Sequence, residues 1–354
     1  DQASKEVNIE NHLQPSLPVI TMKKSECLSV LSKAFFCLYQ RNSYNWQAFP
    51  SMNFDRLYMH SRGFDGCEKA KLQMIISYFV QLYQRHFEGN FVDEEIEFSL
   101  SESKNTWLEW QQDQSELSHF FMEDMYKSLD DAKDDYRIDF ANTYLGGASL
   151  SYGSVQEEIM FSICPEMNVG RLFSPRMKEH QAICIKGTEQ FTTPQGYGHS
   201  LEFGGLYKDH SMVIKNKRQS FVVAIDALDF RGQPTSIQYT QAGILRELNK
   251  FYAAMSIQQT PSTVATGNWG CGVFGGNAEL KLLIQWVSAS RANKNVRYFP
   301  FDNKPVYKRF LEIQKKIQDG QIQLRVCDMI RFFANINARL VFRQFEGFLD
   351  EMSH

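Results

Sequence analysis

The sequence predicts an α/β protein in which a layered sheet follows a mainly helical region. Two observations support this class. Apolar residues recur at helical spacing between residues 21 and 130. After Tyr136, short apolar runs typical of buried strands alternate with helical patterns. We therefore expect a loose polar arm over residues 1–20, a helical accessory region over residues 21–130 and an α/β domain with C-terminal helices over residues 131–354.

The individual elements follow from the same patterns. Helical spacing in the first region is carried by Leu28, Leu31, Phe35 and Leu38, and by Leu72, Ile75, Ile76, Phe79, Val80 and Tyr83. The charge run at residues 130–135 is typical of a solvated turn. The predicted strands are residues 137–141, 182–185, 221–226, 263–266 and 296–301. Helices are expected to begin near Val155, Gln241 and Ala278, with further helices over residues 305–318 and 325–348.

Three of the predicted strands lead into glycine-rich loops, at residues 146–154, 187–198 and 267–276. In open α/β sheets, ligands bind beyond the carboxyl ends of strands, where loops run into helix N-termini. Backbone amides in such loops bind anions. We therefore expect the three loops to form one cleft for an anionic ligand.

The first loop carries candidate catalytic acids. Gly146 and Gly147 let a ligand approach the backbone closely, and Glu157 and Glu158 follow at a predicted helix start. Ser154 and Glu157 also fit a capping box, in which Glu157 would fold back onto the Ser154 amide. Glu158 lies about 100° further around the helix and points elsewhere. Since neighbouring helical residues cannot flank a glycosidic bond from both sides, we expect one acid that first donates a proton and later activates water.

The other two loops offer binding groups. The loop at residues 267–276 has five glycines in ten residues but follows neither the Walker pattern nor a dinucleotide-binding GxGxxG pattern. Its amides precede the helix expected at Ala278 and would bind a diphosphate; the alternative is a structural turn with Trp269 and Phe274 in the core. Tyr197 is either a ligand clamp or an ordinary surface residue. Asn142 would bind a ribose hydroxyl or serve as a turn residue.

Composition argues against several classes of function. A net charge of −3 over 354 residues argues against broad electrostatic binding to DNA or to an anionic membrane. The seven cysteines form no CxxC pair and the histidines show no metal-ligand spacing, so we expect no metal site. Without a secretory signal or an apolar run of membrane-spanning length, we expect reduced thiols and a nuclear or cytoplasmic location. Because the sequence begins at Asp1 without methionine, we expect a fragment or a processed form.

These motifs, in this order, resemble the catalytic region of the poly(ADP-ribose) glycohydrolases. The matching stretches are Asp139–Asn142, Gly146–Glu158, Pro165–Glu166, Arg171–Phe173, Gly187–Gln190, Ala224–Phe230, Arg246–Lys250 and Val264–Gly276. The resemblance extends from about residue 20 into the C-terminal helices and is strongest over residues 137–301. It implies a macrodomain, a three-layer α/β/α fold with a mixed central sheet, together with a helical accessory region.

The resemblance also implies a reaction, the hydrolysis of ribose–ribose O-glycosidic bonds in poly(ADP-ribose) to release ADP-ribose, without metal or organic cofactor. Glu158 would protonate the leaving ribose oxygen and then help water attack an oxocarbenium-like centre. Glu157 and Asn142 would hold the ribose hydroxyls, and Gln156 belongs to the same signature. The implied substrates are poly(ADP-ribose) and ADP-ribosylated proteins, and the implied setting is the DNA damage response. We expect a monomer that contacts neither DNA nor membrane.

The binding residues implied by the resemblance come from all three loops. Backbone contacts to the diphosphate and distal ribose are assigned to Gly146, Gly147, Ala148, Gly270, Gly272 and Gly275. Tyr197 resembles the tyrosine that closes over the ligand. The positions near ribose and adenine are Asn268, Phe274 and Phe301, and the acid that recognises adenine falls near Leu129 and Asp130.

One departure from the family pattern is Ala148, where the family has a third consecutive glycine. The stretch from Leu150 to Gly153 also differs, since small residues are usual there. The Ala148 methyl is tolerated at negative φ, whereas at positive φ it would cost about 1 kcal/mol and shift the loop. An active polymer hydrolase is therefore weighed against an ADP-ribose-binding module with weak or no catalysis, and against a hydrolase of mono-ADP-ribosyl conjugates.

Overall fold

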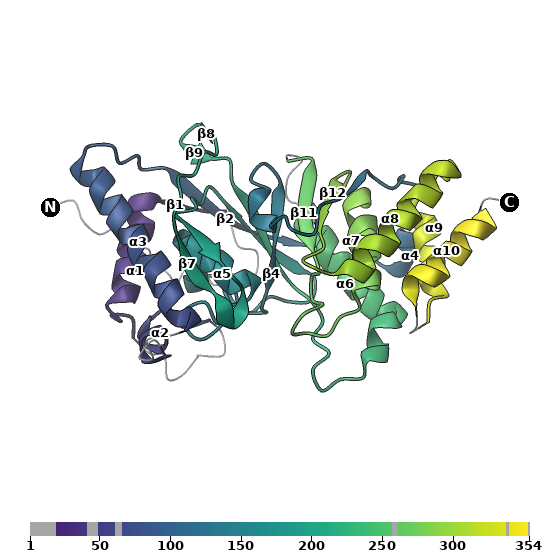
Figure 1. Cartoon of the computed structure of the whole chain (residues 1–354), viewed down its shortest axis with the longest axis horizontal. Helices are drawn as coiled ribbons and strands as arrows, with labels where there is room; N and C mark the ends of the chain where they lie inside the picture. The colour runs from purple at the N-terminus through teal and green to yellow at the C-terminus, as the bar shows by residue number, and fades with distance from the viewer. Residues whose placement is uncertain (1–18, 41–48, 61–65, 257–260, 338–339, 353–354) are drawn as a thin grey trace. The chain divides into compact units, whose positions relative to one another are not determined.

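The computed structural model describes residues 19–40, 49–60, 66–256, 261–337 and 340–352 (Figure 1). Most of the predicted polar arm, residues 1–18, lies outside the described residues. The chain folds as two compact units that are interleaved in the sequence. The first comprises residues 1–100, 141–178 and 183–224, and the second comprises residues 101–140, 179–182 and 225–354. The predicted domain boundaries at residues 20 and 130 stay predictions.

The first unit combines helices with antiparallel strands. Its helices are α1 (Lys24–Phe35), α2 (Asp55–His60), α3 (Cys67–Phe87), α5 (Gln156–Ile163) and the 3₁₀ helices η3 (Pro165–Leu172) and η4 (Gly198–Ser200). Its strands are β1 (Ile20–Lys23), β2 (Glu95–Glu102), β5 (Gln181–Lys186), β6 (Thr192–Gln195), β7 (Glu202–Leu206), β8 (Val213–Ile214), β9 (Lys217–Arg218) and β10 (Phe221–Asp226). The antiparallel pairs are β1 with β2, β5 with β10, β6 with β7 and β8 with β9.

The second unit contains parallel strands and most of the longer C-terminal helices. Its strands, β4 (Tyr136–Ala141), β11 (Thr263–Gly267), β12 (Asn295–Phe299) and β3 (Phe120–Met122), pair in parallel in that order. Its helices are α4 (Trp107–Gln111), η2 (Leu129–Asp131), η5 (Thr235–Tyr239), α6 (Gln241–Met255), α7 (Ala278–Arg291), α8 (Lys304–Asp319), α9 (Val326–Ala334) and α10 (Val341–Met352). The parallel and antiparallel pairs together confirm the predicted α/β class with a mixed sheet.

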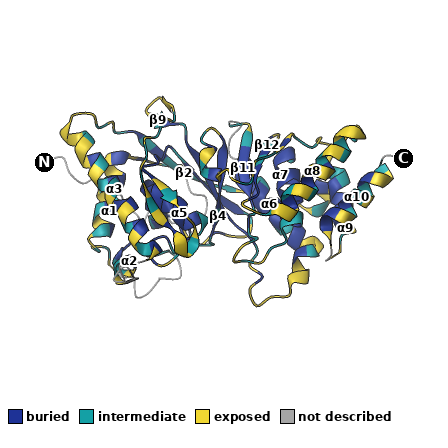
Figure 2. Cartoon of the chain, in the orientation of Figure 1, coloured by how far each residue is buried: buried dark blue, intermediate teal, exposed yellow. Residues whose placement is uncertain are grey.

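All five predicted strands are present and are largely buried (Figure 2). The strand β10 has the predicted limits, and every one of its residues is buried. The strand β12 ends at Phe299, earlier than predicted, because Pro300 has no amide hydrogen with which to continue the ladder. The backbone then turns through Phe301 and Asp302, which both have positive φ.

The structure differs from the sequence predictions in three places. Strands β1, β2 and β3 lie in the region predicted to be mainly helical; in β2 the buried Ile96 and Phe98 alternate with glutamates, a period of two that marks a strand. The single helix predicted over residues 325–348 is two helices, α9 and α10. In α3, the predicted apolar face is partly exposed, and the buried residues are Cys67, Ala70, Lys71, Met74, Ile75, Tyr78 and Leu82.

An apolar cluster in the first unit joins the helices to the first glycine-rich loop. Its buried members are Ala34, Met52, Phe54, Leu57, Ile75 and Leu150. Leu150 belongs to the loop, and its side chain is 4% exposed. The Leu150 side chain is therefore an apolar anchor that holds the loop on the helices of this unit.

Candidate active site

The acid pair lies at the start of α5, with a cap that differs from the predicted one. The helix begins at Gln156, so Val155 is its N-cap residue and Glu158 is its third residue. The Val155 amide donates to Glu158 Oε2 at 3.1 Å. The predicted capping box between Ser154 and Glu157 is therefore wrong by one residue. The Ser154 carbonyl instead accepts a hydrogen bond from the Gly198 amide at 3.0 Å, which fixes the backbone just before the helix.

The Glu157 carboxylate joins Asn142 to the first loop. Its side chain accepts hydrogen bonds from the amides of Asn142 at 2.8 Å and Gly146 at 2.7 Å. Glu157 is 2% exposed. Because each of its oxygens accepts one backbone amide, the Glu157 carboxylate is held in position from two sides.

The Glu158 carboxylate is held on the opposite part of the same loop. Its Oε1 accepts from the Ala148 amide at 3.0 Å, while Oε2 caps α5 through Val155. The two acids therefore take amides from separate peptide units. Glu157 and Glu158 are neighbours in the sequence, but their side chains point in different directions from the helix. They therefore bind different segments of the backbone.

Glycines are needed at two positions of this loop. Gly146 has φ +78° and Gly147 has φ +44°. A Cβ atom at Gly147 would lie 2.6 Å from Glu157 Oε2 and 2.7 Å from Glu158 Oε1. Ala148, in contrast, is not among the described residues with positive φ. The Ala148 methyl therefore imposes no left-handed backbone strain, which answers the question posed by the missing third glycine.

Arg171 supports this loop from η3. The side chain is 4% exposed, and its Nη1 donates to the carbonyl oxygens of Leu145 at 3.1 Å and Gly147 at 3.2 Å. The other side of the guanidinium donates to the Ser51 carbonyl at 3.0 Å. Burial lowers the pKa of Arg171 to about 10, and the two nearby acids oppose that shift. Arg171 lies in one of the stretches that resemble the family, but the sequence predicted no role for it. The surrounding segment is buried, and a charged residue in a buried segment ordinarily has bonded partners.

Asn142 and Tyr197 complete the predicted residues of the first unit. The Asn142 Oδ1 accepts from the Tyr144 amide at 3.1 Å, the turn geometry expected of asparagine at a strand end. Tyr197 is 39% exposed. Burial raises the pKa of Tyr197, while a hydrogen bond from the Gln156 backbone to its hydroxyl acts in the opposite direction. The Tyr197 side chain therefore lies at the start of α5, beside the acid pair.

In the second unit, the loop after β11 has free amides. Trp269 is 0% exposed and its indole donates to the Ile225 carbonyl at 3.0 Å, so this ring is in the core, whereas Phe274 is only partly buried. Within the described part of the chain, several backbone amides of this loop have no hydrogen-bond partner, and they include those of Gly270, Gly272, Val273 and Phe274. Amides without partners just before the N-terminus of a helix are groups that can bind an anion.

Asn268 and Phe301 lie near the carboxyl ends of β11 and β12. The Asn268 side chain donates to the Pro300 carbonyl at 2.7 Å and accepts from the Tyr298 hydroxyl at 2.9 Å, so it fixes the loop on β12. Phe301 is 60% exposed with φ +45°. An exposed aromatic ring on a left-handed backbone is typical of a functional position, because strain of this kind persists where the ring is needed.

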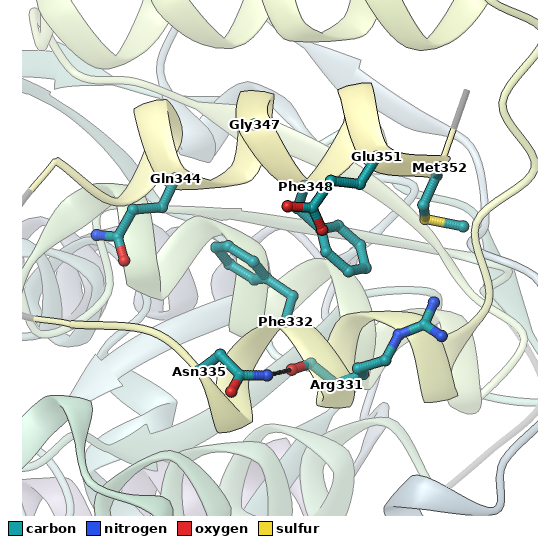
Figure 3. A pocket seen from close by; sticks show the side chains of 8 residues that line it. All are labelled: Arg331, Phe332, Asn335, Gln344, Gly347, Phe348, Glu351 and Met352. Carbon is teal, nitrogen blue, oxygen red and sulfur yellow. Dashed lines mark hydrogen bonds between the residues drawn. The ribbon is translucent and has the colours of Figure 1, made fainter. Parts of the chain in front are cut away.

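The remaining predicted residues and surfaces are less informative. Asp130 lies in η2, half-buried, and its amide donates to the Ser128 hydroxyl at 3.2 Å. Among the described residues, no group of His, Cys, Asp and Glu side chains is arranged to hold a metal ion. No described helix is both long and apolar enough to cross a membrane. A groove of about 620 Å³ between α9 and α10, lined by Phe332, Phe348 and their neighbours, contains none of the predicted site residues (Figure 3).

Comparison with known proteins identifies the class of protein that combines these features. A family model described as the macro domain fold of poly(ADP-ribose) glycohydrolase matches residues 107–308, and a model for the helical domain of the same enzymes matches residues 9–97. The fold is thus a macro domain with an N-terminal helical domain. The chain belongs to the poly(ADP-ribose) glycohydrolase family, and the predicted resemblance is confirmed.

Individual relatives agree with this assignment. The chain is 30% identical over 322 residues to poly(ADP-ribose) glycohydrolase 1 of Caenorhabditis elegans, which covers 86% of this chain and 39% of the relative. It is 28% identical over 333 residues to a probable poly(ADP-ribose) glycohydrolase 2 of Arabidopsis thaliana, covering 80% of this chain and 63% of that one. The chain thus spans less than two thirds of either relative.

Among solved structures, the poly(ADP-ribose) glycohydrolase of Thermomonospora curvata bound to the inhibitor ADP-HPD is similar to this chain with a TM-score of 0.38 and 11% identity. That match covers 82% of this chain and 99% of the other.

Proposed function

We propose that this chain hydrolyses the ribose–ribose O-glycosidic bonds of poly(ADP-ribose) and releases ADP-ribose. Family membership supports this reaction, and the observation that carries it is the fixed acid pair: Glu157 and Glu158 each accept two backbone amides around one glycine turn. Such preorganised carboxylates suit glycosidic cleavage because no side chain has to be reoriented as charge develops.

In the proposed reaction, the protonated Glu158 carboxyl donates its proton to the leaving ribose oxygen as the C–O bond breaks. The resulting carboxylate accepts a proton from water as that water attacks the oxocarbenium-like carbon, which returns Glu158 to its starting form. Glu157, held by the shorter amide contacts, orients the ribose hydroxyls together with Asn142. Tyr197 packs on the ligand beside the acids.

The free amides at Gly270, Gly272, Val273 and Phe274 support a binding role for the second unit. We assign them to the diphosphate, with Gly275 allowing the loop to turn at φ +73°. Phe274 and Phe301 are assigned to ribose and adenine contacts, and Asn268 to holding the loop. In the first loop, the amides of Gly146 and Ala148 are already bound by the acids, so we assign that loop to placing the acids.

The test is to incubate the protein with poly(ADP-ribose) and measure free ADP-ribose. Glu158→Gln should lower the rate by at least about a thousand-fold while ADP-ribose still binds. Glu157→Gln is the matched control variant and should raise KM as well as lower kcat. Full activity of Glu158→Gln would disprove its assignment as the acid.

The same assay separates the competing functions. A binding module would bind ADP-ribose and leave labelled polymer intact, and a mono-ADP-ribosyl hydrolase would prefer mono-modified protein over free polymer. Ala148 favours the active enzyme over the binding module, because its backbone carries no left-handed strain. We also propose that the protein acts as a monomer in the nucleus or cytoplasm, on poly(ADP-ribose) and ADP-ribosylated proteins.

A further inference from the structure

Two buried cations hold the carbonyl side of the loop that binds Glu157 and Glu158. One is Arg171, described above. The other is Lys71 on α3, which is 0% exposed. The carbonyl oxygens that its ammonium contacts are those of Gly153 at 2.5 Å, Ser151 at 2.6 Å, Ser149 at 3.1 Å and Ala148 at 3.4 Å. The two cations together contact six carbonyl groups between residues 145 and 153.

A buried ammonium is stable only where polar groups replace its water. Every hydrogen bond that the structure describes for Lys71 goes to a backbone carbonyl, so the loop acts as its solvation shell. Burial lowers the pKa of Lys71 to about 8, and the negative charge of Glu158 opposes that shift. Lys71 therefore connects α3 to the loop through a buried charge, and all of its described hydrogen bonds go to this loop.

The direction of the peptide units connects Arg171 to the acids. In a trans peptide the carbonyl of one residue and the amide of the next point in opposite directions. The Leu145 carbonyl faces Arg171, and the Gly146 amide of the same unit donates to Glu157. The peptide unit between Gly147 and Ala148 repeats the pattern, because the Gly147 carbonyl faces Arg171 and the Ala148 amide donates to Glu158. The Gly146 amide on Glu157 and the Ala148 amide on Glu158 thus each belong to a peptide unit whose carbonyl is held by Arg171. Lys71 holds the carbonyl of Ala148 itself and those of Ser149, Ser151 and Gly153, which follow it.

We propose that Lys71 and Arg171 are positioning residues for the acid pair. Arg171 keeps the amides of Gly146 and Ala148 directed at the two carboxylates by holding the other ends of their peptide units. Lys71 fixes the stretch from Ala148 to Gly153, which connects that turn to the helix start that carries the acids. Leu150 adds an apolar contact between the loop and the helices of the first unit, because it packs in the cluster that contains Ile75 of α3. The helical domain then contributes to catalysis through Lys71 without touching substrate. This inference rests on the proposed function, since it assumes that Glu157 and Glu158 carry the reaction.

The first experiment compares Lys71→Met, Lys71→Arg and Lys69→Met in polymer hydrolysis. Lys69 is exposed on the same helix and provides the matched control. Lys71→Met should lower kcat by about 10- to 100-fold, the range that small misplacement of catalytic groups produces, with KM changed less than about three-fold. Lys71→Arg keeps a charged donor and should recover most of the loss. Lys69→Met should match the wild type.

The pH profile gives a readout that a purely structural role would not alter. The wild-type kcat should fall as pH rises through about 8, because Lys71 then loses its charge. The charged or titratable groups facing Lys71 are Cys67 and Glu68 on α3, Glu158 on α5 and Arg171 on η3. Lys71→Arg should remain active to a higher pH, since guanidinium keeps its proton.

Stability separates this effect from unfolding. The folded-state pKa of Lys71 lies below its unfolded value of 10.5, so the unfavourable burial of its charge is fully present below pH 8 and disappears as pH rises toward 10.5. Its contribution to stability therefore increases over the pH range in which kcat falls. A decrease in kcat without a decrease in melting temperature supports the positioning role.

Amide hydrogen exchange tests the positioning role independently of activity. In Lys71→Met, the amides of residues 145–155 should exchange at least about ten-fold faster than in the wild type, while those of α7 stay unchanged. If Lys71→Met has the amide exchange rates and the kcat of the wild type, the inference is wrong. It is also wrong if kcat of Lys71→Arg falls with rising pH in the same way as that of the wild type. The Lys71→Arg result is decisive on its own if Lys71→Met does not fold. A wild-type protein inactive on polymer would disprove the proposed function instead, and the exchange result would still decide the role of Lys71.

Discussion

The amide of Ala148 donates to Oε1 of Glu158 at 3.0 Å, and the methyl group of Ala148 lies against Gly153. A Cβ atom at Gly153 would be 2.7 Å from Ala148 Cβ and 2.6 Å from Glu158 Cδ. Alanine at 148 is thus accommodated by glycine at 153. The departure from three consecutive glycines is compensated within the loop, and it leaves the acid in place.

Ala148→Gly should therefore change activity little. We expect kcat within about three-fold of the wild type, because the hydrogen bond to Glu158 comes from the backbone. The free energy of unfolding should fall by about 0.5–1 kcal/mol, since glycine adds conformational freedom to the unfolded chain. Urea unfolding and the polymer assay measure the two quantities. A large gain in activity would show that the methyl group does weaken the site.

Gly147→Ala should abolish activity. The new Cβ would clash with both carboxylates, and φ of +44° adds backbone strain of about 1 kcal/mol. We expect kcat to fall by at least about a hundred-fold. Gly89→Ala is the matched control, because Gly89 has φ +72° and its Cβ would meet no atom within 4 Å. Both variants should lose similar backbone stability, and equal activity in the two would contradict the proposed contact.

Phe301 should show a trade-off between stability and binding. Its left-handed φ of +45° is unfavourable for phenylalanine and neutral for glycine. Phe301→Gly should therefore be more stable than Phe301→Ala by about 1 kcal/mol, while both variants bind ADP-ribose more weakly than the wild type. Thermal unfolding and calorimetric titration with ADP-ribose test this pair. Unchanged affinity in both variants would remove Phe301 from the binding site.

Glu166→Gln should change how stability depends on pH. Glu166 is 0% exposed, and burial raises its pKa to about 7, with Lys24 opposing and Glu189 adding to the shift. Because the folded pKa exceeds the unfolded value of 4.5, the contribution of the protonated carboxyl is fully present below pH 4.5 and is lost as pH rises through 7.

Glutamine has no proton to lose, so Glu166→Gln should gain stability relative to the wild type between pH 5 and 7.5. The expected difference is on the order of 3 kcal/mol, from about two pKa units at 1.4 kcal/mol each. Urea unfolding at both pH values provides the measurement. If the difference in the free energy of unfolding between Glu166→Gln and the wild type is the same at pH 5 and at pH 7.5, Glu166 does not titrate in this range. Glu88→Gln, an exposed substitution of the same kind, is the control.

Local patterns predicted much of the fold. The five strands and three of the helix starts follow from short apolar runs and helical spacing, which depend on neighbouring residues alone. The cap of α5 was predicted at Ser154 but lies at Val155, and the Ser154 carbonyl instead accepts a hydrogen bond from the Gly198 amide, a contact outside the local sequence. The strand β2 was missed although its alternation was visible, since the surrounding region is helical.

The candidate site was predicted in part. Motif order placed Asn142, Glu157 and Glu158 together, and the structure joins them through the Asn142 amide and the loop. Lys71 could not be recognised, because a lysine in an amphipathic helix ordinarily faces solvent. Its partners lie 77 to 82 residues away in the sequence. Only the folded chain shows that this lysine is buried.

The sequence by itself determined the class of fold and the family, and it predicted the acid pair, because these depend on residue types and their local spacing. The tertiary structure decided which acid caps α5, why alanine is tolerated at 148, and which cations hold the loop. Those answers depend on the directions of individual peptide groups and on contacts between distant segments. Neither can be obtained from spacing, since the same residues could be buried or exposed until the packing of α3 on the loop is known.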